Sequence, residues 1–222
     1  MTYKLVIFDF DGTLADTFPW FARVVNGVAD RYRFRRVEEH EVEWLRSLGA
    51  REIMRHLGVP TWKLPLIARH MRALSARDVD GMRLFGGVET MLRSLSSAGV
   101  ALAVVTSNIE GNVRRVLGPD LAGLIGHYAC GASTFGKASK FKRVVRAIGT
   151  RPADVICVGD EIRDHEAARR AGLSFGAVTW GFTSPEALRA LDPEMVFRTP
   201  GEIVEALAPM LAEAHGPVQR AS

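Results

Sequence analysis

Apolar runs that end abruptly in polar residues recur along this chain. In the first, residues 4–8 read KLVIF, and Asp9 and Asp11 follow at once. Continuous apolar runs of this length are typical of strands that are covered on both faces of a sheet. The chain contains five runs that predict strands, at residues 4–8, 100–108, 153–164, 174–180 and 194–197.

Helical periodicity fills the intervals between the later runs. Apolar residues spaced i, i+3, i+4 and i+7 occur twice, as Val88, Met91, Leu92 and Leu95, and as Phe141, Val144, Val145 and Ile148. This spacing puts the apolar side chains on one face of a helix. Glycine follows each of these stretches, and the helical part of the segment DHEAARRAGL likewise ends at Gly172, as is common at the end of a helix. Alternating strands and helices predict an α/β fold with a parallel sheet and right-handed crossovers.

Residues 16–84 interrupt this alternation because only helices are predicted there. The expected helices span residues 19–32, 38–48, 50–57 and 62–77. Since the segment lies between the first two strands, it would stand as a helical cap above the carboxyl edge of the sheet. We therefore expect three parts in the chain: a core of residues 1–15 and 85–213, a cap of residues 16–84, and a flexible tail of residues 214–222.

Composition narrows the class of protein. Apolar residues make up 47% and charged residues 24% of the 222 residues, an ordinary globular balance. No apolar run reaches the ~20 residues of a membrane span, and no secretory signal pattern opens the chain. Cys130 and Cys157 match no metal-binding spacing, so we expect free thiols and a reducing, cytoplasmic location.

The net charge of +4 suits a small anionic substrate. No helix-turn-helix, zinc finger or aromatic-rich RNA-binding motif is present, so a nucleic-acid partner is not expected. We expect the protein to be a monomer or a homodimer.

Polar residues follow three of the predicted strands and should meet at one edge of the sheet. They are Asp9 and Asp11, then Thr106, Ser107 and Asn108, then Asp160 and Asp164. Carboxylates gathered in this way repel one another unless a cation lies between them. Ligands that are all oxygen favour Mg²⁺. Either Lys137 or Lys140 could add the positive charge that a phosphate group requires.

These motifs, in this order, resemble those of the haloacid dehalogenase superfamily of phosphatases. The matching residues are DFDGT at 9–13, Thr106, a lysine, and Gly159 and Asp160 with Asp164. The resemblance covers about residues 1–208 and implies a Rossmann-like core with a helical cap. The segment LFGGVETMLRSL, at residues 84–95, is similar to the phosphoglycolate-phosphatase-like branch.

The resemblance implies a role for each motif. Asp9 would be the nucleophile that forms an aspartyl-phosphate, and Asp11 would act first as acid and then as base. The dehalogenases of the family lack a carboxylate at the position of Asp11, so its presence favours phosphate esters. Thr106 would hydrogen-bond a phosphoryl oxygen, with Ser107 and Asn108 as further donors.

The family also implies how the cation and the lysine are placed. Mg²⁺ would be held by Asp9, Asp160 and the main-chain carbonyl of Asp11, with support from Asp164. Lys137 is favoured over Lys140 because it stands at the entrance of its predicted helix, where the family places its lysine.

Two residues near the site are assigned less directly. Glu161 could face solvent or the waters of the metal. Arg51 follows Gly49 in the cap and could contact the part of the substrate remote from phosphate, although an exposed position on a helix is also consistent with the sequence.

The expected function is a Mg²⁺-dependent phosphatase of a small phosphorylated metabolite, phosphoglycolate-like or a sugar phosphate. A phosphomutase with the same residues is the enzymatic alternative. A protein that binds a phosphorylated metabolite without turnover is the alternative from another class.

Overall fold

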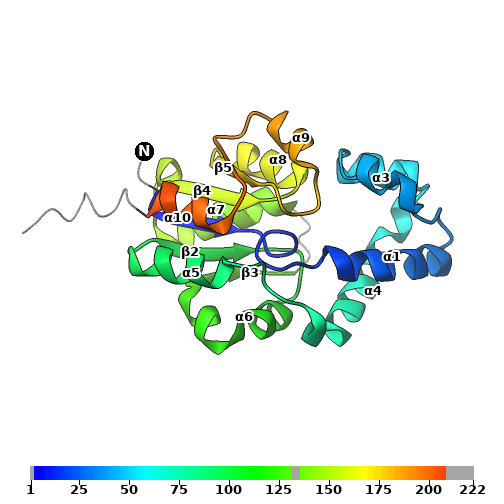
Figure 1. Cartoon of the computed structure of the whole chain (residues 1–222), viewed down its shortest axis with the longest axis horizontal. Helices are drawn as coiled ribbons and strands as arrows, with labels where there is room; N and C mark the ends of the chain where they lie inside the picture. The colour runs from blue at the N-terminus through cyan, green and yellow to red at the C-terminus, as the bar shows by residue number, and fades with distance from the viewer. Residues whose placement is uncertain (1–2, 132–135, 209–222) are drawn as a thin grey trace, which may run out of the picture.

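The computed structural model describes residues 3–131 and 136–208, and at its centre lies one parallel sheet. Its strands follow the order β3-β2-β1-β4-β5-β6, so that β1 lies in the interior between β2 and β4 (Figure 1). All five strand pairs are parallel. The strands are β1 (Leu5–Phe8), β2 (Ala101–Val105), β3 (His127–Ala129), β4 (Val155–Gly159), β5 (Ser174–Val178) and β6 (Met195–Phe197).

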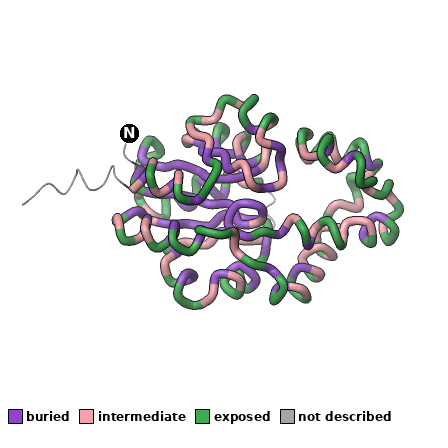
Figure 2. Tube along the Cα trace, in the orientation of Figure 1, coloured by how far each residue is buried: buried purple, intermediate pink, exposed green. Residues whose placement is uncertain are grey.

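Helices cover both faces of this sheet, and their apolar residues form two core clusters. Val6 and Phe8 of β1 contribute to the cluster under α5 (Val88–Ser97), α6 (Glu110–Leu124) and α10 (Pro200–Leu207). Leu5 and Ile7 point to the other face, toward α7 (Gly136–Ile148) and α8 (Ile162–Ala171). The central strands are buried throughout, as their continuous apolar runs predict (Figure 2).

Five α-helices of the described residues remain, and the short α9 adds Leu188 to the second core cluster. Four of them belong to the insertion between β1 and β2, and α9 follows β5 (Figure 1). They are α1 (Phe18–Tyr32), α2 (Val42–Leu45), α3 (Ala50–His56), α4 (Leu64–Arg77) and α9 (Pro185–Arg189). We refer to α1–α4 and their connections as the cap.

The chain enters and leaves the cap through two segments that lie side by side. The backbone N–H of Asp16 donates to the carbonyl of Arg83 over 2.9 Å, and that of Phe85 donates to the carbonyl of Leu14 over 3.0 Å. These crossings coincide with the predicted limits of residues 16–84. The division into core and cap as separate domains stays a prediction.

The predicted fold class is confirmed: an α/β fold with a parallel sheet and a helical insertion after the first strand. The structure also differs from the sequence expectation in several elements, among them α6 and α10, for which no helix was predicted. The sheet has a sixth strand, β3, that the sequence pattern did not reveal, because its residues, His127, Tyr128 and Ala129, form no apolar run. In place of a helix over 38–48 there is a 3₁₀ turn, Glu39–Glu41, followed by the four-residue α2.

The tail predicted at residues 214–222 lies outside the described residues. Across residues 3–131 and 136–208, no helix combines the length and the apolar character needed to cross a membrane.

Candidate active site

The register of the sheet brings the predicted strand-end residues together. Phe8 of β1 pairs with Val104 of β2 on one side and with Val158 of β4 on the other. The residues that follow these three positions therefore leave the sheet at the same edge. Asp9, Thr106 and Asp160 thus come from three neighbouring strands, and all three are buried.

Asp9 is paired with Lys137 inside the protein. Only 4% of Asp9 is exposed, and Lys137 Nζ lies 2.8 Å from Asp9 Oδ2 and 2.7 Å from Asp164 Oδ1. The other oxygen of Asp9 accepts a hydrogen bond from the backbone N–H of Phe10 over 2.8 Å. Burial raises the pKa of Asp9 to about 7, although Lys137 opposes the shift. Lys137, which the sequence favours over Lys140, thus lies beside Asp9, and its role in the reaction stays a prediction.

Asp160 is fully buried and fixed by two donors. Thr13 Oγ1 donates to Asp160 Oδ1 over 2.6 Å, and the backbone N–H of Phe182 donates to Asp160 Oδ2 over 2.8 Å. Burial raises the pKa of Asp160 well above its ordinary value, and neighbouring carboxylates add to the shift. A Cβ at Gly12 or at Gly181 would lie 2.3 Å from an atom of the Asp160 side chain, so glycine is required at both positions.

Asp164 completes a group of three buried carboxylates. It lies in the first turn of α8, and its Oδ2 accepts from the backbone N–H of Glu161. Burial opposes ionisation, but Lys137 and Arg163 hold the pKa of Asp164 below its ordinary value.

The three carboxylates have the arrangement of a cation site. Asp9, Asp160 and Asp164 each offer an oxygen within 4.8 Å of the others. Repulsion among them contributes to the raised pKa values of Asp9 and Asp160. A divalent cation would relieve that repulsion, and a donor set of oxygens alone suits Mg²⁺.

Asp11 is held apart from this group by Asn108. Asn108 Nδ2 lies 3.3 Å and 3.2 Å from the two carboxylate oxygens of Asp11. The carboxylate of Asp11 is not a member of the three-carboxylate group, and ligation through its main-chain carbonyl stays a prediction. Burial raises the pKa of Asp11, whereas the hydrogen bond from Asn108 lowers it.

Asn108 is itself fixed from the cap side. Its Oδ1 accepts from Asn112 Nδ2 over 3.1 Å, and Asn112 Nδ2 also reaches Ser75 Oγ of α4 over 3.2 Å. Ser75 is the buried residue of α4. Sequence reasoning missed Asn112 and Ser75, because neither stands at a strand end.

Thr106 and Lys140 organise the end of β2. Thr106 Oγ1 accepts from the backbone N–H of Asn108 over 3.1 Å, and Ser107 is exposed toward the cavity described below. Lys140 is buried, and its Nζ donates to the carbonyl of Thr106 over 2.7 Å and to that of Gly131. Lys140 therefore secures the loop that carries Thr106 and makes no ion pair with a described carboxylate.

Arg51 and Arg46 of the cap differ from the sequence expectation. Arg51 is exposed on α3 and is absent from the cavity lining, so this conformation favours the alternative of an exposed helix residue. Arg46, which sequence reasoning missed, lines the cavity and donates to the carbonyls of Gly181 and Phe182 over 3.0 Å and 3.1 Å. Its own carbonyl accepts from the backbone N–H of Ser184.

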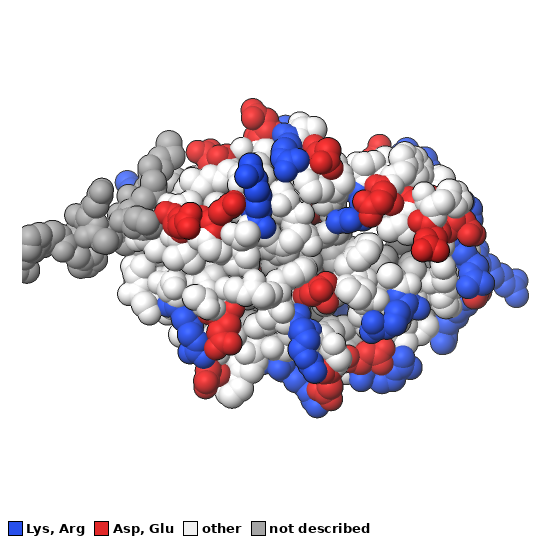
Figure 3. Space-filling model, in the orientation of Figure 1, with Lys and Arg blue, Asp and Glu red and all other residues white. Residues whose placement is uncertain are grey.

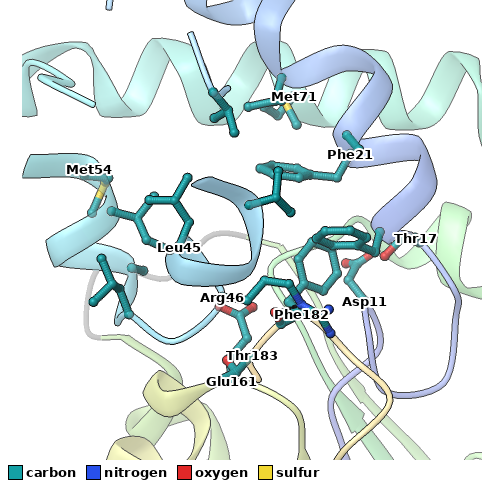
Figure 4. Close-up of a pocket in the computed structure, with 18 of the residues that line it drawn as sticks. Asp11, Thr17, Phe21, Leu45, Arg46, Met54, Met71, Glu161, Phe182 and Thr183 are labelled. Atoms are coloured by element: carbon teal, nitrogen blue, oxygen red, sulfur yellow. Dashed lines mark hydrogen bonds between the residues drawn. The ribbon is translucent and has the colours of Figure 1, made fainter. Parts of the chain in front are cut away.

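A cavity of about 630 Å³ opens between this site and the cap. Asp11, Ser107 and Asn108 belong to its lining on the core side, as does Glu161, which pairs with Arg163. Figure 4 shows Asp11 and Glu161 at one end of the space and Met71 at the other. On the face shown in Figure 3, acidic and basic side chains are mixed over both the core and the cap, and several basic ones lie along the right edge, over the cap.

Comparison with known proteins agrees with this geometry. Residues 6–178 match the model of the haloacid dehalogenase-like hydrolases. The chain belongs to that family. It is 31% identical over 211 residues to a phosphoglycolate phosphatase of Synechococcus elongatus, covering 95% of this chain and 100% of that protein. It is also 25% identical to an N-acetylmuramic acid 6-phosphate phosphatase of Pseudomonas aeruginosa, covering 93% of this chain and 96% of that one.

The fold recurs in solved structures of the haloacid dehalogenase-like family. A hydrolase of this family from Streptococcus pneumoniae superposes with a TM-score of 0.76 at 18% identity, over 92% of this chain and 98% of that one. The predicted family, its phosphoglycolate-phosphatase-like branch and the enzyme class are thereby confirmed: the protein is a phosphatase of the haloacid dehalogenase family.

Proposed function

We propose that this phosphatase hydrolyses a small phosphorylated metabolite with the help of Mg²⁺, through an aspartyl-phosphate on Asp9. The observation that carries the proposal is the pairing of a buried carboxylate, Asp9, with Lys137 beside a second carboxylate, Asp11, that Asn108 orients. A nucleophile and an acid–base group side by side are what a two-step phosphoryl transfer requires.

In the first step, a carboxylate oxygen of Asp9 attacks phosphorus and the bond from phosphorus to the ester oxygen breaks. Asp11 gives its proton to the departing oxygen, so that an alcohol leaves. In the second step, Asp11 takes a proton from a water molecule as that water attacks phosphorus. The bond to Asp9 then breaks and inorganic phosphate is released, which restores the Asp9 carboxylate and the protonated Asp11.

The neighbouring residues stabilise charge during both steps. Lys137 Nζ, within 2.8 Å of Asp9, balances the negative charge that gathers on the phosphoryl oxygens. Thr106 and Ser107 offer hydroxyl donors at the end of β2. Asp9, Asp160 and Asp164 would hold Mg²⁺, which would supply further positive charge beside the phosphoryl group.

Relatives support the reaction class and leave the substrate open. The two curated relatives are named for phosphate monoesters as different as phosphoglycolate and N-acetylmuramic acid 6-phosphate. In the mechanism, the core residues described above contact only the phosphoryl group and the ester oxygen, so they serve esters of either kind.

Phosphate release tests the proposal. The full-length protein should release inorganic phosphate from p-nitrophenyl phosphate with Mg²⁺, and release should stop with EDTA and in Asp9→Asn. Release that persists in Asp9→Asn would contradict the role of Asp9. Transfer of phosphate within a sugar phosphate without release would indicate the phosphomutase, and binding without either reaction would indicate a non-catalytic protein.

A further inference from the structure

The cap is hollow on the side that faces the active site. The cavity of about 630 Å³ runs from Asp11 into the space between the cap helices. Its cap-side walls are mainly apolar, and side chains from all four cap helices project into it (Figure 4). Among these residues are Phe21, Val25, Leu45, Ile53, Met54 and Met71.

Most of these apolar side chains keep part of their surface exposed. Val25, Ile53, Met54 and Met71 are only half-buried, and α3 has no buried residue at all. The cap is correspondingly less buried than the strands (Figure 2). Protein interiors are normally packed to the density of organic crystals. A ligand with an apolar body would remove this surface from water and fill the space.

Several polar groups on the same walls already have partners within the protein. Asn26 exchanges two hydrogen bonds with the backbone of Val37, at 3.0 Å and 2.8 Å. Arg46 is directed to backbone carbonyls of the core, and Trp20 Nε1 donates to Asp78 over 3.1 Å. Thr17 and Glu39 also belong to the lining, but polar groups remain few beside the apolar ones. Of the three lining arginines, Arg46 pairs with Glu43 and Arg163 with Glu161, so Arg72 is the one that, among the described residues, is left to bind a substrate carboxylate.

The size of the cavity also favours a ligand with an apolar body. Pockets of ~300–1,000 Å³ hold molecules of drug size, whereas a two-carbon acid leaves most of such a space empty. We propose that the cavity receives an apolar leaving group, an alkyl chain or an aromatic ring, so that the preferred substrate is an amphiphilic phosphate monoester. This inference rests on the proposed function, with the phosphoryl group at the Asp9 end and the apolar body in the cap.

A series of n-alkyl phosphates from methyl to octyl, with phosphoglycolate beside it, tests the inference. The value of kcat/KM should rise by about fourfold for each methylene that enters the cavity, the fold-change that corresponds to ~0.8 kcal/mol per buried CH₂. The value of kcat/KM for octyl phosphate should exceed the value for phosphoglycolate. A kcat/KM that is independent of chain length, or highest for phosphoglycolate, would overturn the inference and point to Arg72 as an anion-binding group.

A matched pair of variants on α4 locates the effect. Met71→Asp puts a charge on the cavity wall (Figure 4), so the ratio of kcat/KM for octyl to methyl phosphate should collapse. Ala73→Asp adds the same charge to the same helix at an exposed position outside the lining, and the ratio should be kept. Equal ratios in the two variants would contradict binding of the chain in this cavity.

Binding without turnover separates failure of this inference from failure of the proposed function. Calorimetry with n-octylphosphonate and methylphosphonate, which are not hydrolysed, should show tighter binding and a more negative heat-capacity change for the octyl compound. If no ester is hydrolysed but this difference appears, the function fails and the apolar site stands. If esters are hydrolysed and the two phosphonates bind alike, the function stands and the apolar site fails.

Discussion

Replacing each of the two lysines of α7 by methionine separates the charge that serves the reaction from the one that serves the fold. Lys137 Nζ lies 2.8 Å from Asp9 and 2.7 Å from Asp164, and its side chain is 18% exposed. Lys140 Nζ instead donates to the carbonyls of Thr106 and Gly131. Methionine keeps much of the length of lysine and removes only the charge and the donors.

The expected size of each effect follows from the groups that each lysine contacts. A preorganised donor at a developing negative charge is worth ~2.7–4 kcal/mol, so Lys137→Met should lower kcat/KM by about 10²–10³-fold. Lys140→Met leaves two carbonyls without their donor, and an unsatisfied buried group costs ~1–3 kcal/mol. That cost should fall on the free energy of unfolding, and kcat/KM should drop by about tenfold or less.

Both quantities can be measured on the same preparations. Steady-state hydrolysis of p-nitrophenyl phosphate with saturating Mg²⁺ gives kcat/KM, and urea unfolding gives the free energy of unfolding. If Lys140→Met lost more activity than Lys137→Met while both stayed folded, the assignment of Lys137 to the phosphoryl-transfer site would be wrong.

Three further substitutions probe the surroundings of the site. Asn108→Ala frees the Asp11 carboxylate from a charged hydrogen bond of ~1.5–3 kcal/mol, so kcat/KM for an alkyl phosphate should fall by roughly 10–100-fold. The fall should be smaller for p-nitrophenyl phosphate, whose leaving group needs no proton, and equal losses would count against the acid role. Gly181→Ala puts a Cβ 2.3 Å from Asp160, so it should cost ~1–3 kcal/mol of stability and weaken Mg²⁺ binding in calorimetry, whereas an unchanged Kd would refute the crowding argument. In the cap, a backbone hydrogen bond lowers the pKa of Glu41 from 4.5 to about 2, so its ionised form stabilises the fold fully above about pH 4.5 and loses that effect as the pH falls toward 2. The difference in free energy of unfolding between the unaltered protein and Glu41→Gln should therefore shrink as the pH falls over that range. A difference that stays constant in urea unfolding would refute a stabilising role of ionised Glu41.

The sequence predicts the strand-end part of the site well, for a physical reason. Asp9 and Asp160 each follow a continuous apolar run, and neighbouring parallel strands place such positions at one edge of the sheet. The periodic helix that begins near Lys137 places this lysine at the same edge. These inferences need only the period of each element and the parallel order of the strands.

The contacts of the cap could not be predicted in this way. Arg46 and Arg51 are alike in type and lie close in the chain, and only the packing of the cap on the core makes Arg46 the residue that reaches the backbone beyond β5. A helical pattern says which side chains face inward. It does not say whether residues such as Met54 and Met71 pack together or line a space.

The central claim is that the phosphoryl group passes through the side chain of Asp9, and trapping that intermediate tests it most directly. Asp11→Asn should slow the attack of water, so the phosphorylated protein should accumulate after mixing with p-nitrophenyl phosphate and Mg²⁺. Acid quenching and reduction with borohydride would convert an acyl phosphate at this position to homoserine, which peptide mass spectrometry detects. We predict homoserine at position 9. Phosphate release with no modified residue, or with the modification at another residue, would contradict the account.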